Sequence, residues 1–343
     1  MTHSLITAFG LASKMQVVES RVALESQVRL FHSEEYVTLL QANADTLKPE
    51  EEEEYGLGYD CPVLPDLWGL VCQLAGGTLT AVDQLINGKA KVAINWCGGW
   101  HHAQRDSAAG FCYVNDIVLA IRVLQSKFDK ILYLDLDVHH GDGVENAFLF
   151  STKVMTVSLH QYEVGFFPGT GHITHTGVGK GRHYTLNIPY KPAINDQQFV
   201  HIFESVLYPI CEVFRPDALV CQCGGDVLAG DPLGSANITP EGYKQCVQHI
   251  LNINKPTLFL GGGGYNKANT AKLWTHITAK IINETIPSEI PEHDFFSQYG
   301  PSFEMDISPS LRKSDNTHQH IHHIITTTLD NIGKLTELLN KPL

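Results

Sequence analysis

The 343-residue sequence has few charged residues and no long apolar run. Charged residues make up 18% of the chain and hydrophobic residues 43%, a balance typical of folded globular proteins. A run of about 18 apolar residues, as a membrane-spanning helix needs, does not occur. The first residues lack a basic segment followed by an apolar one, so we expect no secretory signal and an intracellular protein.

Cysteine pairs of the C-x-x-C kind are also missing. We therefore expect the eight cysteines to be reduced thiols, most of them small core residues. Basic residues are the minority, since 24 Lys and Arg stand against 37 Asp and Glu, and the formal net charge is -13. This balance disfavours direct binding to nucleic acid and favours a basic partner such as a lysine-rich peptide.

Strand-like and helix-like tracts alternate along the middle of the chain. We expect strands at 92–95, 131–136, 154–159, 184–188, 218–222 and 257–260, and helices at 113–126, 197–214, 240–253 and 270–283. Repeated strand-helix-strand order predicts an α/β fold with a mostly parallel sheet flanked by helices, in one domain covering residues 1–343. Apolar residues at helical spacing predict an amphipathic packing helix at 321–339, and a run of glutamates at 50–54 is typical of a solvated connector.

A row of polar residues follows the apolar tract 130–134. Asp135, Asp137 and His139 alternate along a strand, so their side chains point in a common direction at its carboxyl end, where open α/β sheets bind ligands. Capping the next turn would need only one carboxylate, so three polar groups side by side indicate a metal site. We expect Asp137 and His139 to be two ligands, with Asp226 from another strand end as the third.

This ligand set leaves one coordination position open. Three protein ligands and a water molecule are typical of catalytic zinc, and Fe²⁺ or Co²⁺ would also suit one imidazole and two carboxylates. Such a metal lowers the pKa of its water and polarises a substrate carbonyl. The row therefore predicts metal-assisted hydrolysis.

Two further tracts supply candidate catalytic groups. His101 and His102 follow a strand end and a glycine turn, and Asp135 and Asp142 are candidate partners that fix the tautomers of the two imidazoles. Tyr265 follows the glycines 261–264, which lack the lysine of a phosphate-binding loop. We expect a flexible hinge there that presents the phenol to a developing oxyanion.

Taken in order, these tracts closely resemble the class I zinc-dependent histone deacetylases. The matching stretches are GYDCP at 58–62, INWCGGWHHA at 94–103, GFCYVND at 110–116, DLDVHHGDGVE at 135–145, GFFPGTG at 165–171, AGDP at 229–232 and GGGGY at 261–265. The tryptophan before the two histidines and the AGDP tract point to the type-8 branch. The resemblance implies the arginase/deacetylase fold and hydrolysis of N6-acetyl-lysine in histones and other proteins to lysine and acetate, with a metal-activated water as nucleophile.

The resemblance also implies roles for individual residues. Asp137, His139 and Asp226 would bind zinc, while His102 would act as general base and then acid. The residues that would assist them are His101 by its charge, Tyr265 on the acetyl carbonyl, and Asp135 and Asp142 behind His101 and His102. The tunnel for the lysine side chain would be formed by Gly110, Phe111, Phe167, Leu233 and Gly263, with Asp60 on its rim.

Two potassium sites are implied as well. The first would use Asp135, the hydroxyl of Ser158, and main-chain oxygens of Asp137, His139 and Leu159. The second would use main-chain groups near Phe148, Ser151, Val154 and Tyr184. The resemblance further implies a chromatin regulator that contributes to transcriptional repression in nucleus and cytoplasm. Its partners would be acetylated protein tails such as histones, without nucleic acid or membrane binding, and corepressor partners are left open.

The sequence departs from the family pattern at two places. The family normally begins with another strand and a basic segment before the helix that opens here at about Thr2, so we expect the sheet to lack that strand. The basic cluster before the zinc strand is thinned at 125–130. A manganese amidinohydrolase on the same fold is one alternative, but it usually needs two metals bridged by extra carboxylates. An inactive binding protein is another, although the intact ligands, base and phenol argue against it.

Overall fold

The computed structural model describes residues 1–42 and 48–340. A parallel sheet of six strands forms its centre, in the order β1-β6-β5-β2-β3-β4. The strands are β1 (Val92–Asn95), β2 (Ile131–Asp135), β3 (Val154–Gln161), β4 (Thr185–Tyr190), β5 (Ala218–Gln222) and β6 (Thr257–Leu260). The predicted α/β fold with a parallel sheet is confirmed, and each predicted strand is present.

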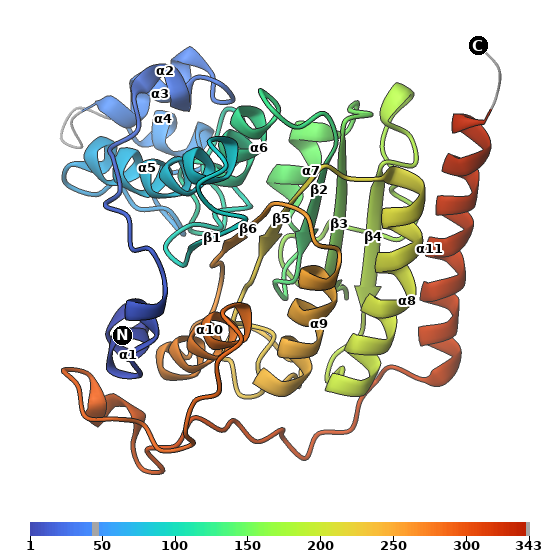
Figure 1. Cartoon of the computed structure of the whole chain (residues 1–343). Helices are drawn as coiled ribbons and strands as arrows, with labels where there is room; N and C mark the ends of the chain where they lie inside the picture. The colour runs from blue at the N-terminus through green and yellow to red at the C-terminus, as the bar shows by residue number, and fades with distance from the viewer. Residues whose placement is uncertain (43–47, 341–343) are drawn as a thin grey trace.

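Helices cover the two faces of this sheet, as Figure 1 shows. They are α1 (Thr2–Ala8), α2 (Glu25–Val28), α3 (Glu34–Gln41), α4 (Pro49–Glu54), α5 (Leu67–Ile86), α6 (Asp116–Leu124), α7 (Asp142–Phe148), α8 (Asp196–Phe214), α9 (Pro240–Asn252), α10 (Lys267–Ile281) and α11 (His318–Leu339). None of the helices in the described part of the chain is both long and apolar enough to cross a membrane.

The central strand β2 explains why the sheet is covered on both faces. Leu132 and Leu134 pack into a core with α8, α9, α10 and α11, while Ile131 and Tyr133 pack into a second core with α5, α6 and α7. All five residues of β2 are buried, as expected for a parallel strand between two helical layers. The polar residues that follow β2 are therefore fixed by a rigid strand.

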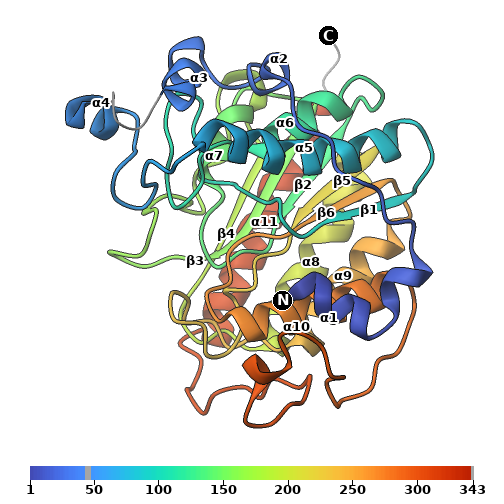
Figure 2. The ribbon, with the colours of Figure 1, turned by 90° about the vertical axis from the view of Figure 1, so that its left-hand side faces the viewer.

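The C-terminal part of the chain forms the packing helix that its apolar spacing predicts. In α11, Ile321, Ile324, Ile332 and Leu335 are buried and the helix contacts α8 and β4. At the other end of the chain, α1 lies against α10 (Figure 2). Both terminal helices thus pack onto the same layer of the domain.

The glutamates at 50–54, expected in a solvated connector, form part of helix α4, and their described side chains are exposed or partly exposed. A proline at its first position and acidic residues in its first turn favour a helix. Among the described residues, β1 is an edge strand of the sheet and pairs with β6.

Candidate active site and metal centre

The candidate site lies at the carboxyl ends of four neighbouring strands. β1, β6, β5 and β2 are adjacent and parallel, so the loops that follow them meet at one edge of the sheet. These loops comprise residues 96–103, 261–265, 223–234 and 136–143, and each carries predicted site residues. The sheet order thus brings together groups that are far apart in the sequence.

Three predicted metal ligands converge there. The ligand atoms of Asp137, His139 and Asp226 all lie within 4.8 Å of one another, and the three residues are buried. The Nδ1 atom of His139 lies 3.1 Å from Asp137 Oδ1 and 3.1 Å from Asp226 Oδ2. This nitrogen and one oxygen of each carboxylate therefore face a common point.

The remaining carboxylate oxygens are held by the backbone and by a glutamine. Asp137 Oδ2 accepts hydrogen bonds from Gln222 Nε2 (2.8 Å) and from the N–H of Gly263 (2.9 Å). Asp226 Oδ1 accepts one from the N–H of Val138 (3.0 Å). A Cβ atom on Gly263 would lie 2.0 Å from Asp226 Oδ2, so only glycine lets the backbone approach this closely.

The electrostatics of this cluster suit a divalent cation. Burial and the charge of Asp137 raise the pKa of Asp226 to about 7. Burial would lower the pKa of His139, but its hydrogen bonds to Asp137 and Asp226 raise it to about 10. Two buried carboxylates beside one imidazole form a donor set of oxygen and nitrogen, and a cation would compensate their negative charge. The residues present therefore fit a metal ion.

Each of the two adjacent histidines has its own aspartate. His101 Nδ1 donates to Asp135 Oδ2 (2.8 Å), and His102 Nδ1 donates to Asp142 Oδ1 (2.7 Å). The ring centroids of the histidines are 3.9 Å apart, and both side chains are buried. Since Nδ1 is bound to a carboxylate in each case, Nε2 is the nitrogen left for chemistry.

The two imidazoles have opposite pKa shifts. Burial alone would lower the pKa of His101, but the charges of Asp135 and Asp137 raise it to about 9. Burial and the charge of His101 lower the pKa of His102 to about 4, against the opposing effect of Asp142. The charges around the two imidazoles therefore favour the protonated form of His101 and the neutral form of His102, and unlike shifts of this kind are typical of acid and base pairs in enzymes.

Aromatic side chains stand beside these groups. The ring of Phe167 meets His102 edge-on with centroids 4.9 Å apart, and the ring of Phe111 lies 5.7 Å from that of Tyr265. Phe111 and Phe167 are each 42% exposed, as tunnel walls would be but core residues would not. A Cβ atom on Gly110 would lie 2.6 Å from the His102 ring, so the turn before Phe111 requires glycine.

Two other predicted substrate residues lie on loops, Leu233 on the loop after β5 and Asp60 on the loop before Cys61. Leu233 is 44% exposed, and Asp60 is exposed on the loop before Cys61. The Cys61 thiol lies 3.8 Å from the carbonyl oxygen of Cys112, which places the Asp60 loop against the segment that carries Phe111. The Tyr265 N–H donates to Asp231 Oδ2 (2.8 Å), and burial with the charges of Asp137 and Asp226 raises the pKa of its phenol above the ordinary value.

Several supporting residues did not stand out in the sequence. Tyr133 donates to Asp135 Oδ2 (2.6 Å), and Gln222 donates to Asp137. Both lie toward the carboxyl ends of buried strands, a position that hints at a role but does not reveal the partner. Asp116 accepts hydrogen bonds from the N–H groups of Gly99 and Trp100 and so supports the turn before the histidines.

Two more missed histidines anchor the loop that carries Phe167. His140 Nδ1 lies 2.8 Å from Thr170 Oγ1, and His160 Nε2 donates to the carbonyl oxygen of Gly171 at 2.9 Å. The preceding residue, Phe166, stacks on His139 with centroids 5.2 Å apart. The aromatic wall is therefore tied to the sheet at three points.

The residues expected at the two potassium sites are near neighbours. Asp135 and Ser158 are register partners on β2 and β3. At the second site, the N–H of Ser151 donates to the carbonyl oxygen of Phe148 (2.8 Å) and the N–H of Val154 to Ser151 Oγ (3.1 Å). Tyr184 precedes β4, and its carbonyl oxygen accepts from Thr156 on β3. Potassium binding stays a prediction.

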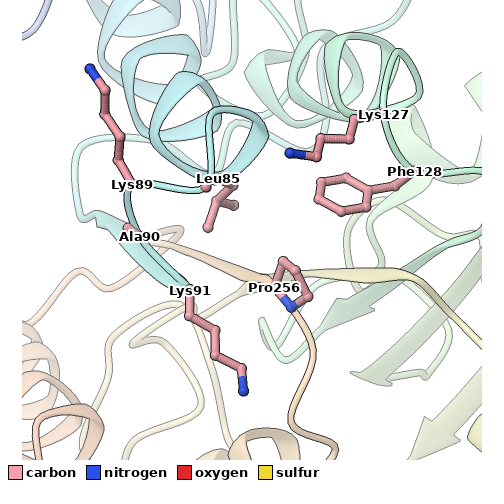
Figure 3. A pocket seen from close by; sticks show the side chains of 8 residues that line it. Leu85, Lys89, Ala90, Lys91, Lys127, Phe128 and Pro256 are labelled. Carbon is pink, nitrogen blue, oxygen red and sulfur yellow. The ribbon is translucent and has the colours of Figure 1, made fainter.

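Two cavities lie away from the candidate metal ligands. One, of about 360 Å³, opens at the amino ends of β1 and β6, where Lys127 points toward the cavity and Lys89 and Lys91 point away (Figure 3). The other, of about 450 Å³, is lined by Arg29, Leu30, Phe31, His32, Gln104, Arg105, Arg122, Asn146 and Ala147. None of the predicted site residues lines either cavity.

Comparisons with known proteins give the family. Residues 1–281 match the histone deacetylase domain. Histone deacetylase 8 of Danio rerio is 48% identical over 97% of this chain and 88% of its own length, and that of Xenopus tropicalis is 48% identical over 95% and 89%. Histone deacetylase 1 of Homo sapiens is 40% identical over 98% of this chain and 70% of its own length. These similarities confirm the resemblance inferred from the sequence, including its type-8 character.

Proposed function

The chain belongs to the histone deacetylase family and is a lysine deacetylase, and we propose a zinc-dependent mechanism in which a metal-activated water attacks the acetyl carbon of N6-acetyl-lysine. The observation that carries this proposal is the convergence of Asp137, His139 and Asp226 beside two histidines that are each hydrogen-bonded to an aspartate. Zinc suits these ligands, and Fe²⁺ or Co²⁺ would also fit. When bound, the cation would polarise the acetyl carbonyl and lower the pKa of a water molecule.

His102 is the general base in this proposal. Its Nδ1 donates to Asp142, so Nε2 holds a lone pair that accepts the proton of the attacking water. The same nitrogen then returns the proton to the departing lysine amine. A low pKa keeps His102 neutral and ready to accept that proton near neutral pH.

His101 and Tyr265 stabilise the negative charge that develops on the acetyl oxygen. Asp135 and Asp137 raise the pKa of the buried His101, which favours its protonated form, and a charge in such a site acts strongly because water screens it little. The raised pKa of Tyr265 keeps its phenol protonated, so it donates a hydrogen bond to that oxygen. Asp135 and Asp142 hold the two imidazoles.

The substrate in this proposal is an acetylated lysine in a protein tail such as that of a histone. Phe111 and Phe167 provide two aromatic faces for the aliphatic lysine side chain, with Gly110, Leu233 and Gly263 beside them. Asp60 on the rim binds the substrate backbone. The net charge of -13 favours a basic tail.

We further propose that the catalytic domain spans residues 1–343, because α11 packs on α8 and β4 and completes their core. Potassium ions at the two sites described above would stabilise β2, β3 and the end of α7. The protein acts in nucleus and cytoplasm as a chromatin regulator that contributes to transcriptional repression, with no direct contact to nucleic acid or membrane.

Metal removal tests the mechanism. We expect a chelator to abolish hydrolysis of an acetyl-lysine peptide, and one equivalent of Zn²⁺ per chain to restore it, because the described residues form one three-ligand group of this kind. The measurements are acetate release and metal content. Full activity in a metal-free sample would overturn the proposal, and two metals per chain would favour the amidinohydrolase alternative.

A further inference from the structure

A glutamine stands behind the proposed base. Gln104 lies two residues after His102, and its Nε2 donates to Asp142 Oδ2 (3.0 Å) and to the carbonyl oxygen of His102 (3.0 Å). The other oxygen of Asp142 accepts the hydrogen bond from His102 Nδ1. The carboxylate is therefore held between an imidazole on one side and an amide on the other.

The orientation of this amide is set by its contacts. Both groups that face Gln104 Nε2 are acceptors, while Gln104 Oε1 accepts a hydrogen bond from Asn146 Nδ2 (3.0 Å). A flipped amide would put its oxygen against the carboxylate of Asp142 and lose all three hydrogen bonds. Asn146 lies four residues after Asp142 on α7, so both side chains are on the same side of that helix.

The amide pair lies between the base and a cavity. Gln104 and Asn146 line the cavity of about 450 Å³, whereas the side chain of Asp142 is 14% exposed and His102 is buried. Without the glutamine, water from the cavity would reach Asp142 Oδ2. Water is a mobile donor, so the carboxylate and the imidazole bound to it would lose a fixed orientation.

We propose that Gln104 is a positioning residue of the deacetylation reaction, which holds Asp142 so that His102 keeps the tautomer and ring orientation needed for proton transfer. Asn146 supports it by fixing the amide. This inference deepens the proposed function and rests on it. Since Gln104 contacts neither Phe111 nor Phe167, its loss should lower kcat and leave KM nearly unchanged.

The test compares two substitutions of Gln104 in the zinc-loaded enzyme. Gln104→Met keeps the length but removes the donor, and we expect kcat on an acetyl-lysine peptide to fall by about 10-fold with KM within about 2-fold. Gln104→Lys keeps a donor toward Asp142 and should retain kcat within about 3-fold. Gln248→Met is the matched control, because the side-chain amide of Gln248 also donates a hydrogen bond to an asparagine, Asn252 on α9, at an exposed position.

A second measurement does not depend on turnover. In the metal-free protein, the Nδ1 proton of His102 should give a downfield proton resonance, which Gln104→Met weakens and Gln248→Met leaves unchanged. The inference is overturned if Gln104→Met leaves both kcat and this resonance as in the natural protein, or if Gln104→Lys loses as much kcat as Gln104→Met. A natural protein that shows the resonance but does not deacetylate the peptide would contradict the proposed function and leave the positioning of His102 supported.

Discussion

His101 and His102 are adjacent in the sequence, both buried and each paired with an aspartate, yet their pKa values shift in opposite directions. His101 lies toward the metal ligands, with its Nε2 3.9 Å from Asp137 Oδ1, and Asp135 and Asp137 are the carboxylates that raise its pKa most. Asp142 and Asp137 also raise the pKa of His102, but burial and the charge of His101 outweigh them. The difference shows that the charges around an imidazole, and not its direct partner alone, decide its protonation.

Removing each imidazole in turn should change activity more than any other substitution that tests this comparison. We expect His102→Ala to lower kcat by about 10³-fold, because it removes the general base. His101→Ala should lower kcat by about 10²-fold, because it removes electrostatic stabilisation and leaves the base in place. Kinetics on an acetyl-lysine peptide measure both, with His172→Ala, at an exposed histidine, as control. Equal losses at positions 101 and 102 would show that the two imidazoles share one role.

Substituting Asp135 and Asp142 tests the same comparison by measuring the free energy of unfolding. Asp135 is fully buried and accepts hydrogen bonds from His101, Tyr133 and the N–H of Asp137, so Asp135→Asn should lower the free energy of unfolding by about 3 kcal/mol. Asp142 is partly exposed and faces a neutral imidazole, so Asp142→Asn should lower it by about 1 kcal/mol. Urea unfolding of the metal-free proteins gives these values. A larger loss for Asp142→Asn would reverse the assignment of the charged pair.

A last test concerns His32, a histidine whose pKa is lowered by burial like that of His102. Burial lowers the pKa of His32 to about 4, and its ring bonds the Arg105 carbonyl oxygen and the Asn115 N–H. Between pH 6.5 and 4 the unfolded chain binds a proton that the folded chain does not, so this group lowers stability as the pH falls through that range. At pH 5 its contribution is about 2 kcal/mol less favourable than at pH 8.

Urea unfolding at pH 8 and pH 5 measures the effect of His32. The loss of stability between the two pH values should be smaller in His32→Gln than in the natural protein, since glutamine does not titrate. An equal loss in both proteins would show that His32 is protonated in the folded state.

The sequence predicted the parts of the site that depend on local spacing. The spacing of Asp135, Asp137 and His139 predicted polar groups at the carboxyl end of a strand. In the structure β2 ends at Asp135, and Asp137 and His139 lie in the loop that follows, where their ligand atoms meet that of Asp226. The six strands followed from apolar tracts in the same way. The glutamate run at 50–54 was expected to be solvated, but its helical conformation in α4 was not predicted.

The sequence alone determined which groups are available for chemistry and that strand ends would present them. Only the tertiary structure decided which loops meet, because the order β1-β6-β5-β2 is not the order of the chain. It also decided that the pKa of His101 is raised and that of His102 lowered, that Gln104 holds Asp142, and that Gln222 holds Asp137. Charge and hydrogen bonding act through space, so residues remote in the sequence set them.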